Sequence, residues 1–263
     1  MVKNMISNAV ITSMILQLAI SVLFPIIVLI YFRKKYKINW KVVGIGVLIF
    51  IGFAQILETP FHVFMLGNEA TSELLKNPFL YALYGALTAA IFEEAGRFIA
   101  FFYLLKKFRE YKDGLAYGIG HGGIESISIG ALASLQTLYF AISINNGSFA
   151  QLIEKAPQLS QVQDLLLSTS PSLYLLGGVE RILALVLQIA FSMLVLYGVK
   201  HKKYIFVIYA GLFHAFIDFF AALYQKQVIN IFVAEGITFI CAVGAFILIR
   251  KMKDKLTIKP EKN

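Results

Sequence analysis

The sequence predicts an all-α, polytopic membrane helix bundle of about seven transmembrane helices. Hydrophobic residues make up 59% of the 263 residues and charged residues only 15%, whereas a soluble domain of this length would carry about 25% charged residues. Long apolar segments, each near the ~20 residues that a helix needs to cross a bilayer, alternate with short polar connections. A single integral membrane domain over residues 1–263 is enough for this length.

Seven apolar segments can be followed along the chain, and most of the connections between them are short. The longest connection, residues 145–171, repeats apolar residues at a spacing close to one helical face. We expect an amphipathic segment there that lies on the outer surface and is kinked near Pro157. The predicted spans are 8–32, 41–66, 79–106, 114–144, 172–199, 204–224 and 228–250.

The placement of positive charge predicts the orientation of the chain. Of the 24 Lys and Arg residues, 18 fall on one set of connections and the C-terminal tail, and four fall on the opposite set. The positive-inside rule therefore places the N-terminus outside and the C-terminus in the cytoplasm of a multi-pass protein of the cell membrane. This asymmetry explains the net charge of +9, so the charge does not require a nucleic acid as a partner. The expected partner is membrane lipid.

The third span carries ionisable residues in its middle. Glu93 and Glu94 precede Arg97 by four and three residues, so on a helix the guanidinium can reach either carboxylate. One ion pair would orient the helix, but it needs only one glutamate. The second carboxylate must be protonated, bind a metal or hold a water, and ionisable groups inside a membrane are a functional-site hypothesis by default.

Two further spans each pair a histidine with an acid. His121 precedes Glu125 by four residues, and His214 precedes Asp218 by four, so each pair shares one helix face. Counting the helix rise from the inner boundary places Glu94, His121 and His214 within about 10–18 Å of the cytoplasmic surface. They could therefore meet in one pocket.

Other polar residues in the spans have more modest roles. Glu180 and Arg181 are predicted to form a structural ion pair or to support the site from the fifth span. Glu58 and His62, four residues apart around Pro60, are better explained as a hydrogen-bonded helix end. We give Glu235 no role.

These residue types predict hydrolytic chemistry. Histidines and carboxylates without thiolates suit zinc, and the single Cys241 excludes a cysteine cluster and an intrachain disulfide. His121, Glu125, His214 and Asp218 are the candidate metal ligands, although Glu125 and Asp218 could instead orient the imidazoles. A spare glutamate would act as general base, and a His or Arg would stabilise an oxyanion. A metal-free site, in which a Glu and a His activate the water and the other His stabilises the tetrahedral intermediate, is also coherent.

Three motifs in order carry a family resemblance. Glu93-Glu94-x-x-Arg97, Tyr117-x-x-x-His121 and His214-x-x-x-Asp218 resemble the motifs of the CAAX prenyl protease and bacteriocin-processing superfamily. The string Gly-His-Gly-Gly-Ile-Glu at 120–125 is similar to the YhfC family of intramembrane metalloproteases. The resemblance implies Glu93 or Glu94 as the water-activating acid, and His121 and His214 as metal ligands or oxyanion contacts.

The spacing of the first motif departs from the prenyl-protease pattern. Two residues, not three, separate the glutamates from the arginine, which turns the arginine by about 100° on a helix. The sequence is in this respect closer to the PrsW-like branch, so a prenylated substrate does not follow from the resemblance.

The sequence thus predicts an intramembrane peptidase that acts on a membrane-protein or peptide substrate. The first alternative is an ion- or proton-coupled transporter, in which the same acids and histidines would form a relay. The second is a non-catalytic scaffold, because the superfamily also resembles the APH-1 subunit of gamma-secretase. The metal content of the purified protein would discriminate best between the peptidase and its alternatives.

Overall fold

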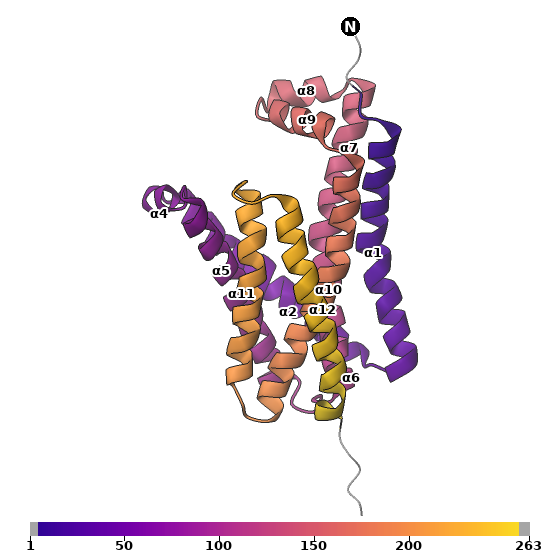
Figure 1. Cartoon of the computed structure of the whole chain (residues 1–263), viewed down its shortest axis with the longest axis vertical. Helices are drawn as coiled ribbons and strands as arrows, with labels where there is room; N and C mark the ends of the chain where they lie inside the picture. The colour runs from indigo at the N-terminus through magenta and orange to yellow at the C-terminus, as the bar shows by residue number, and fades with distance from the viewer. Residues whose placement is uncertain (1–4, 258–263) are drawn as a thin grey trace, which may run out of the picture. The chain divides into compact units, whose positions relative to one another are not determined.

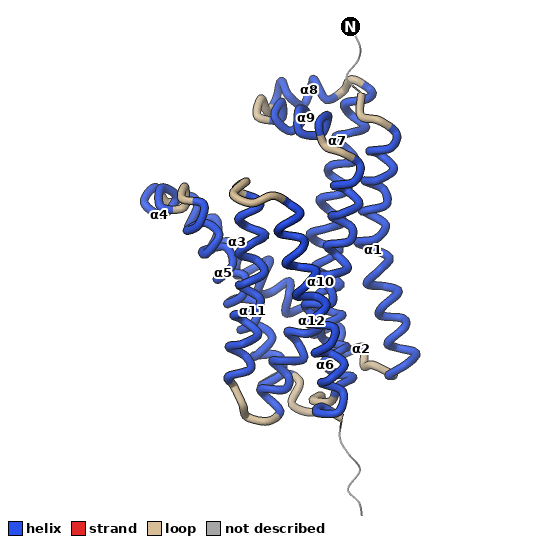
Figure 2. Tube along the Cα trace, in the orientation of Figure 1, coloured by secondary structure: helices blue, strands red, loops and turns tan. Residues whose placement is uncertain are grey.

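The computed structural model describes residues 5–257 and is built of helices (Figures 1 and 2). No strand occurs among these residues, which confirms the all-α prediction. The helices, including three π-helices designated η1 to η3, are α1 Asn8–Tyr36, α2 Trp40–Phe50, η1 Ile51–Glu58, α3 Thr59–Gly67, α4 Glu69–Leu74, α5 Pro78–Ile99, η2 Ala100–Leu104, α6 Tyr111–Glu125, η3 Ser126–Ala131, α7 Leu132–Asn146, α8 Phe149–Lys155, α9 Leu159–Ser168, α10 Pro171–Lys200, α11 Ile205–Gln225 and α12 Ile231–Leu256.

Six continuous helical stretches within residues 5–257 are long and apolar enough to cross a membrane, which makes the protein a multi-pass integral membrane protein. The third predicted span, 79–106, corresponds to α5 with η2 and is not among the six. Glu93, Glu94 and Arg97 lie in the second half of α5. The count of seven therefore remains a prediction. The six stretches are Asn8–Tyr36, Trp40–Gly67, Tyr111–Asn146, Pro171–Lys200, Ile205–Gln225 and Ile231–Leu256.

The chain groups into two compact units, whose boundaries fall within α1, α6 and α10. The first unit contains residues 1–26 and 125–182, and the second contains residues 27–124 and 183–263. The expectation of a single domain is not tested by this grouping and remains a prediction.

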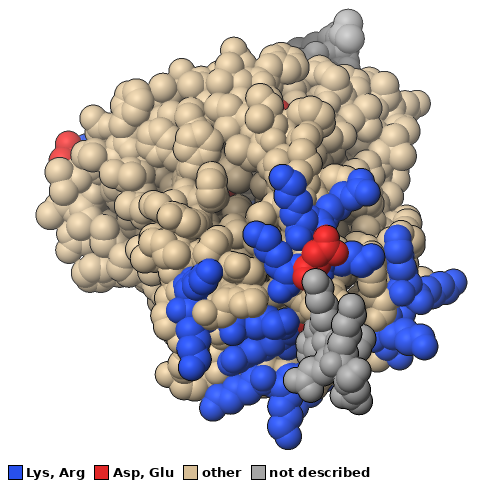
Figure 3. All heavy atoms as spheres, turned by 60° about the horizontal axis from the view of Figure 1, so that its bottom comes forward, with Lys and Arg blue, Asp and Glu red and all other residues tan. Residues whose placement is uncertain are grey.

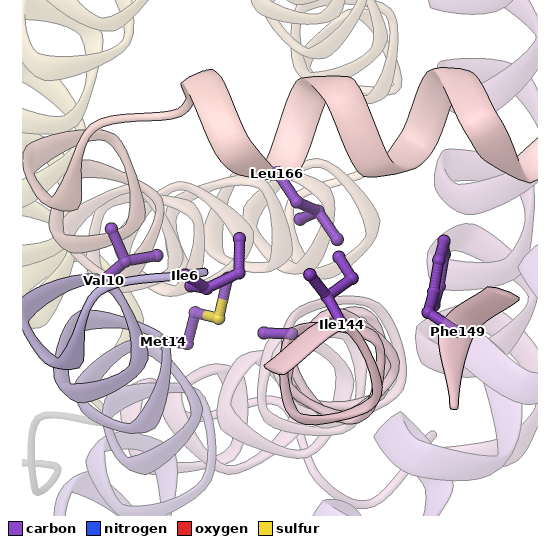
Figure 4. Packing of buried hydrophobic residues seen from close by; sticks show 7 residues of the cluster. Ile6, Val10, Met14, Ile144, Phe149 and Leu166 are labelled. Carbon is purple, nitrogen blue, oxygen red and sulfur yellow. The ribbon is translucent and has the colours of Figure 1, made fainter. Parts of the chain in front are cut away.

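The first unit has an apolar core where α1, α7, α8 and α9 meet (Figure 4). Asn145 fixes the entrance to α1, because its side chain accepts a hydrogen bond from the Ile6 amide at 2.7 Å and donates one to the Ile6 carbonyl at 2.9 Å. The predicted amphipathic segment is two short helices, α8 and α9, which are interrupted around Pro157. The buried members of the core are Ile6, Val10, Met14, Ala141, Ile144, Phe149 and Leu166.

The second unit is organised around the C-terminal half of α10, where most residues from Leu185 onward are buried. α6 packs closely on this half because three glycines recur along it at four-residue spacing. A Cβ atom added at Gly114 or Gly118 would lie 2.6 Å from Met193 Sδ or Ile189 Cα, which is closer than two such atoms can approach. Glycine at these positions therefore brings α6 and α10 together, as small residues do between membrane helices.

α2 approaches α6 equally closely on another side. A Cβ atom on Gly46 would collide with the Tyr117 carbonyl, and one on Gly120 would collide with the Val43 carbonyl. Because the obstacles are backbone atoms, side-chain rotation cannot relieve the overlap. This crossing fixes the position of His121, which directly follows Gly120 on α6.

We expect Gly46→Ala to lower the thermal stability of the protein, because overpacking typically costs about 1–3 kcal/mol. The matched control is Gly44→Ala on the same helix, where an added Cβ atom meets nothing within 4 Å. The control should be neutral or slightly stabilising, since alanine is favoured over glycine by roughly 1 kcal/mol in a helix. Thermal unfolding of both purified variants checks the prediction, and equal melting temperatures would contradict it.

Lys and Arg side chains gather on one face of the second unit (Figure 3). They come from the ends of α1 and α12, from the start of α2 and from the turns between α5 and α6 and between α10 and α11. This is the set of connections that the charge count places in the cytoplasm. Of the residues in that count, Lys3, Lys259 and Lys262 lie outside the described residues.

The orientation can be tested with a reporter enzyme that is active only in the cytoplasm. Fused after Asn263, the reporter should be active, because the basic face is expected to remain inside. Inserted at Gln158, between α8 and α9, it should be silent. The opposite pattern would overturn the predicted topology.

Candidate functional site

The polar residues of α5 form the centre of a buried cluster in the second unit. Asn77 caps the start of the helix, and its side chain accepts hydrogen bonds from the amides of Phe79 and Leu80. From that start, α5 runs four turns before Glu93 and Glu94, which are 7% and 4% exposed. Two carboxylates buried to this degree require compensation by charge and by hydrogen bonds.

Arg97 provides that compensation from the next turn of α5. Its guanidinium is fully buried and donates to Glu94 through Nη1 and to Glu93 Oε2 through Nη2, the latter at 3.0 Å. Nη2 also donates to the Gln188 side-chain oxygen, and the Gln188 amide donates to Glu93 Oε2 at 3.2 Å. The guanidinium therefore holds both carboxylates at fixed positions, which a single point charge could not do.

Each glutamate contacts a different histidine. His121 Nε2 on α6 lies 2.9 Å from Glu93 Oε2. His214 Nδ1 on α11 lies 3.0 Å from Glu94 Oε1. The structure thus brings four of the predicted residues together around Arg97, and it assigns each imidazole to its own carboxylate.

Aromatic rings hold the two imidazoles in place. Phe50 packs edge-on against His121 with ring centroids 5.2 Å apart, and Tyr117 lies 5.9 Å from the same ring. Phe191 stacks on His214 at 4.9 Å with an interplanar angle of 18°. Neither imidazole can rotate without displacing a buried aromatic side chain.

The other predicted site residues lie at the edges of this cluster or outside it. Asp218 Oδ2 is 3.3 Å from His214 Nε2, so His214 lies between two carboxylates. Glu125 is the last residue of α6, one turn after His121. Within the first unit, Arg181 pairs with Glu180 and lies 3.9 Å from Glu125.

Three buried polar atoms of the cluster have no hydrogen-bond partner among the described residues. They are Glu94 Oε2, His121 Nδ1 and the Tyr117 hydroxyl. A buried polar atom in this state costs about 1–3 kcal/mol, so a protein retains one where a water or a ligand completes it. The three atoms mark the cluster as a place that can accept a ligand.

Two residues of this region carried little or no weight in the sequence prediction. Gln188 bridges Arg97 and Glu93, and it was detectable as a lone polar residue within the apolar run of the fifth predicted span. Glu58, buried at the end of η1, pairs with His62 at 3.0 Å, as expected for a hydrogen-bonded helix end. η1, which ends at Glu58, packs against α5, the helix that carries Glu93 and Glu94, so Glu58 is closer to the cluster than the spacing alone indicated.

The fold and the cluster define a class: a multi-pass helical membrane protein with a buried Glu–His–Arg site whose residue types can bind a metal ion. The family model described as "YhfC intramembrane metalloprotease" matches residues 20–238. The chain belongs to this family. This assignment confirms the resemblance to the YhfC family drawn from the string at 120–125, while the wider superfamily that the three motifs resemble remains a prediction.

A relative of known sequence supports the same assignment. The "Uncharacterized membrane protein YhfC" of Bacillus subtilis (strain 168) is 41% identical over 230 residues, which cover 86% of this chain and 89% of the relative. No solved structure matches the chain significantly.

Proposed function

We propose that this protein is an intramembrane peptidase that hydrolyses peptide bonds of a membrane-protein or peptide substrate. The observation that carries the proposal is the environment of Glu94. One of its oxygens is bonded to Arg97 and His214, and the other is buried without a hydrogen-bond partner among the described residues. A carboxylate oriented through one oxygen and available through the other is suited to activate a water.

Glu94 would act first as a general base. It accepts a proton from the water as the water oxygen forms a bond to the carbonyl carbon of the substrate. The carbon–nitrogen bond then breaks, and the departing amine must receive a proton. General acid–base catalysis of this kind is typically worth about 10²–10⁴ in rate.

Protonated Glu94 would return its proton to the departing amine, and His214 and Asp218 offer a path by which Glu94 exchanges protons with the surface of the unit. The imidazole contacts Glu94 through Nδ1 and Asp218 through Nε2, so it can take a proton on one side and release one on the other. The Asp218 side chain is 36% exposed, whereas Glu94 is buried. The three groups thus connect the buried base to the surface of the unit.

Arg97 and Gln188 keep the two carboxylates in place throughout. Arg97 offsets the charge of Glu93 and Glu94, and in its absence two buried carboxylates would repel each other. A fixed cation beside the reacting carbonyl also stabilises the negative charge that develops on its oxygen. Because the Arg97 cation is already in position before the reaction, the surrounding groups need to reorganise less as the charge develops.

The residues present also fit a metal ion. Within the second unit, Glu93 and His121 offer an oxygen and a nitrogen 2.9 Å apart. Carboxylate and imidazole donors of this kind are typical of zinc sites, and we propose zinc as the metal. When bound, zinc supplies an acidified water and a polarised carbonyl.

The proposal is tested by cleavage of a transmembrane reporter substrate in proteoliposomes that contain the purified protein. Wild-type protein should cleave, and His121→Ala and His214→Ala should each be inactive although folded. His201→Ala is the matched control, because His201 is exposed in the turn after α10, and it should cleave like wild type. Wild-type-like cleavage by both site variants would overturn the shared site.

Zinc is tested separately by metal analysis of the same preparations. We expect near-stoichiometric zinc in wild type and in His201→Ala, and loss of zinc in His121→Ala. Full activity after chelation, combined with inactive histidine variants, would overturn the metal and leave the water activated by Glu94. Proton-driven solute uptake without cleavage would overturn the peptidase and favour a transporter.

A further inference from the structure

The second unit contains an apolar cavity next to the candidate site. It has a volume of about 440 Å³ and lies among α10, α11 and α12, within the roughly 300–1,000 Å³ typical of ligand pockets. Its lining is almost entirely apolar and includes Phe206, Phe213, Gly244 and Leu248. An occupant must therefore be hydrocarbon over most of its length.

The ends of α11 and α12 nearest this cavity carry lysines of the basic face of the unit. Lys202 and Lys203 lie in the turn that leads into α11, and Phe206 is the second residue of that helix. On α12, Lys251 follows Leu248 by three residues, so it continues the same face. All three lysines are exposed, and they lie in the turn between α10 and α11 and at the end of α12, which supply the basic face.

We propose that this cavity binds one acyl chain of an anionic phospholipid, whose phosphate lies against Lys203 and Lys251. The apolar lining matches the chain, and the lysines match the phosphate. A zwitterionic lipid would gain less from the lysines. A helix of another protein would need an open groove along α11 and α12, whereas the cavity reaches inward to α10.

The bound chain would contact the candidate site through a single ring. Phe191 lines the cavity and also stacks on His214 at 4.9 Å. An occupied cavity would hold Phe191 against the imidazole, so the lipid would help to fix His214. This last consequence rests on the proposed function, whereas lipid binding itself does not.

The experiment uses full-length protein in liposomes that contain a phosphatidylglycerol with a photoactivatable group on its acyl chain. After illumination, the labelled residues are mapped by mass spectrometry. We expect labels on the cavity-lining residues of α10, α11 and α12, and weaker labelling there by a phosphatidylcholine probe with the same chain. Equal labelling by the two lipids would overturn the choice of an anionic lipid.

Two variants and one control complete the test. Gly244→Phe should sharply reduce labelling in the cavity, because Gly244 lines the cavity, its new side chain would take up part of the space, and an added Cβ atom there meets nothing within 4 Å. Gly236→Phe on the same helix, where a Cβ atom also meets nothing within 4 Å, should be labelled like wild type. The double variant Lys203→Glu/Lys251→Glu should lose the preference for phosphatidylglycerol.

Unchanged labelling in Gly244→Phe would overturn the cavity as the binding site. Because labelling is read without a peptidase substrate, failure of the peptidase assay leaves this result intact.

Discussion

Glu94→Gln should abolish cleavage while the protein still folds and inserts into the membrane. Glutamine keeps the shape of the side chain and can still meet Arg97 and His214, but it cannot accept the proton of the attacking water. Loss of a general base typically lowers the rate by about 10²–10⁴. The measurement is the initial rate of reporter cleavage in proteoliposomes, compared with wild type at equal protein content.

The matched control is Glu73→Gln, which neutralises an exposed carboxylate whose ion-pair partner is the exposed Lys76. Exposed pairs contribute at most about 1 kcal/mol, so this variant should cleave like wild type. Glu93→Gln should also be inactive, but through loss of zinc and not through loss of the base. Glu93 contacts Arg97, Gln188 and His121. Its zinc content should fall, whereas that of Glu94→Gln should not. Wild-type turnover by Glu94→Gln would show that another group activates the water.

The class of fold was predictable because a membrane imposes a simple length rule. Apolar segments near 20 residues are sufficient to indicate spanning helices, and the described helices follow the predicted segments closely. The third segment, 79–106, compares with Pro78–Leu104 for α5 and η2. The connection 145–171 was expected to be helical and interrupted at Pro157, and it is.

The π-helices were not predictable from these patterns. η1, η2 and η3 each continue directly from an α-helix, and the first residue of each π-helix is neither Gly nor Pro. A π-helix shifts the hydrogen bond by one residue, and such segments are frequent at functional sites. η2 begins three residues after Arg97, and η3 begins directly after Glu125. The tertiary packing that selects this geometry has no local sequence signal.

The candidate site was predictable to the extent that it is local. The contacts of Arg97 with Glu93 and Glu94 follow from helical spacing alone, as does the contact of His214 with Asp218. Depth counting placed Glu94, His121 and His214 at a common level, but it could not assign each histidine to its glutamate. That assignment depends on how α6 and α11 pack against α5. The role of Gln188 depends on the packing of α10 in the same way.

The second large effect is expected for Arg97→Ala, which should lower the thermal stability of the protein and its accumulation in the membrane. Arg97 is fully buried and donates to Glu93, Glu94 and Gln188. Its removal leaves two adjacent buried carboxylates without their cation. Breaking a buried ion pair from one side typically costs about 3–5 kcal/mol, which is a large share of the stability of a typical protein.

Two further variants distinguish three effects on stability: loss of the positive charge, loss of the guanidinium geometry and loss of an arginine side chain in general. Arg97→Lys should recover part of the stability, because lysine keeps the charge but cannot hold both carboxylates with a planar fork. Arg250→Ala is the matched control, since Arg250 is exposed and lies 5.9 Å from the ring of Phe246, the same distance that separates Arg97 from Phe191. Its melting temperature should stay near that of wild type. If Arg97→Ala had the same melting temperature as the Arg250→Ala control, the Glu93 and Glu94 carboxylates would be neutral in the folded protein. Glu94 could then not act as the base.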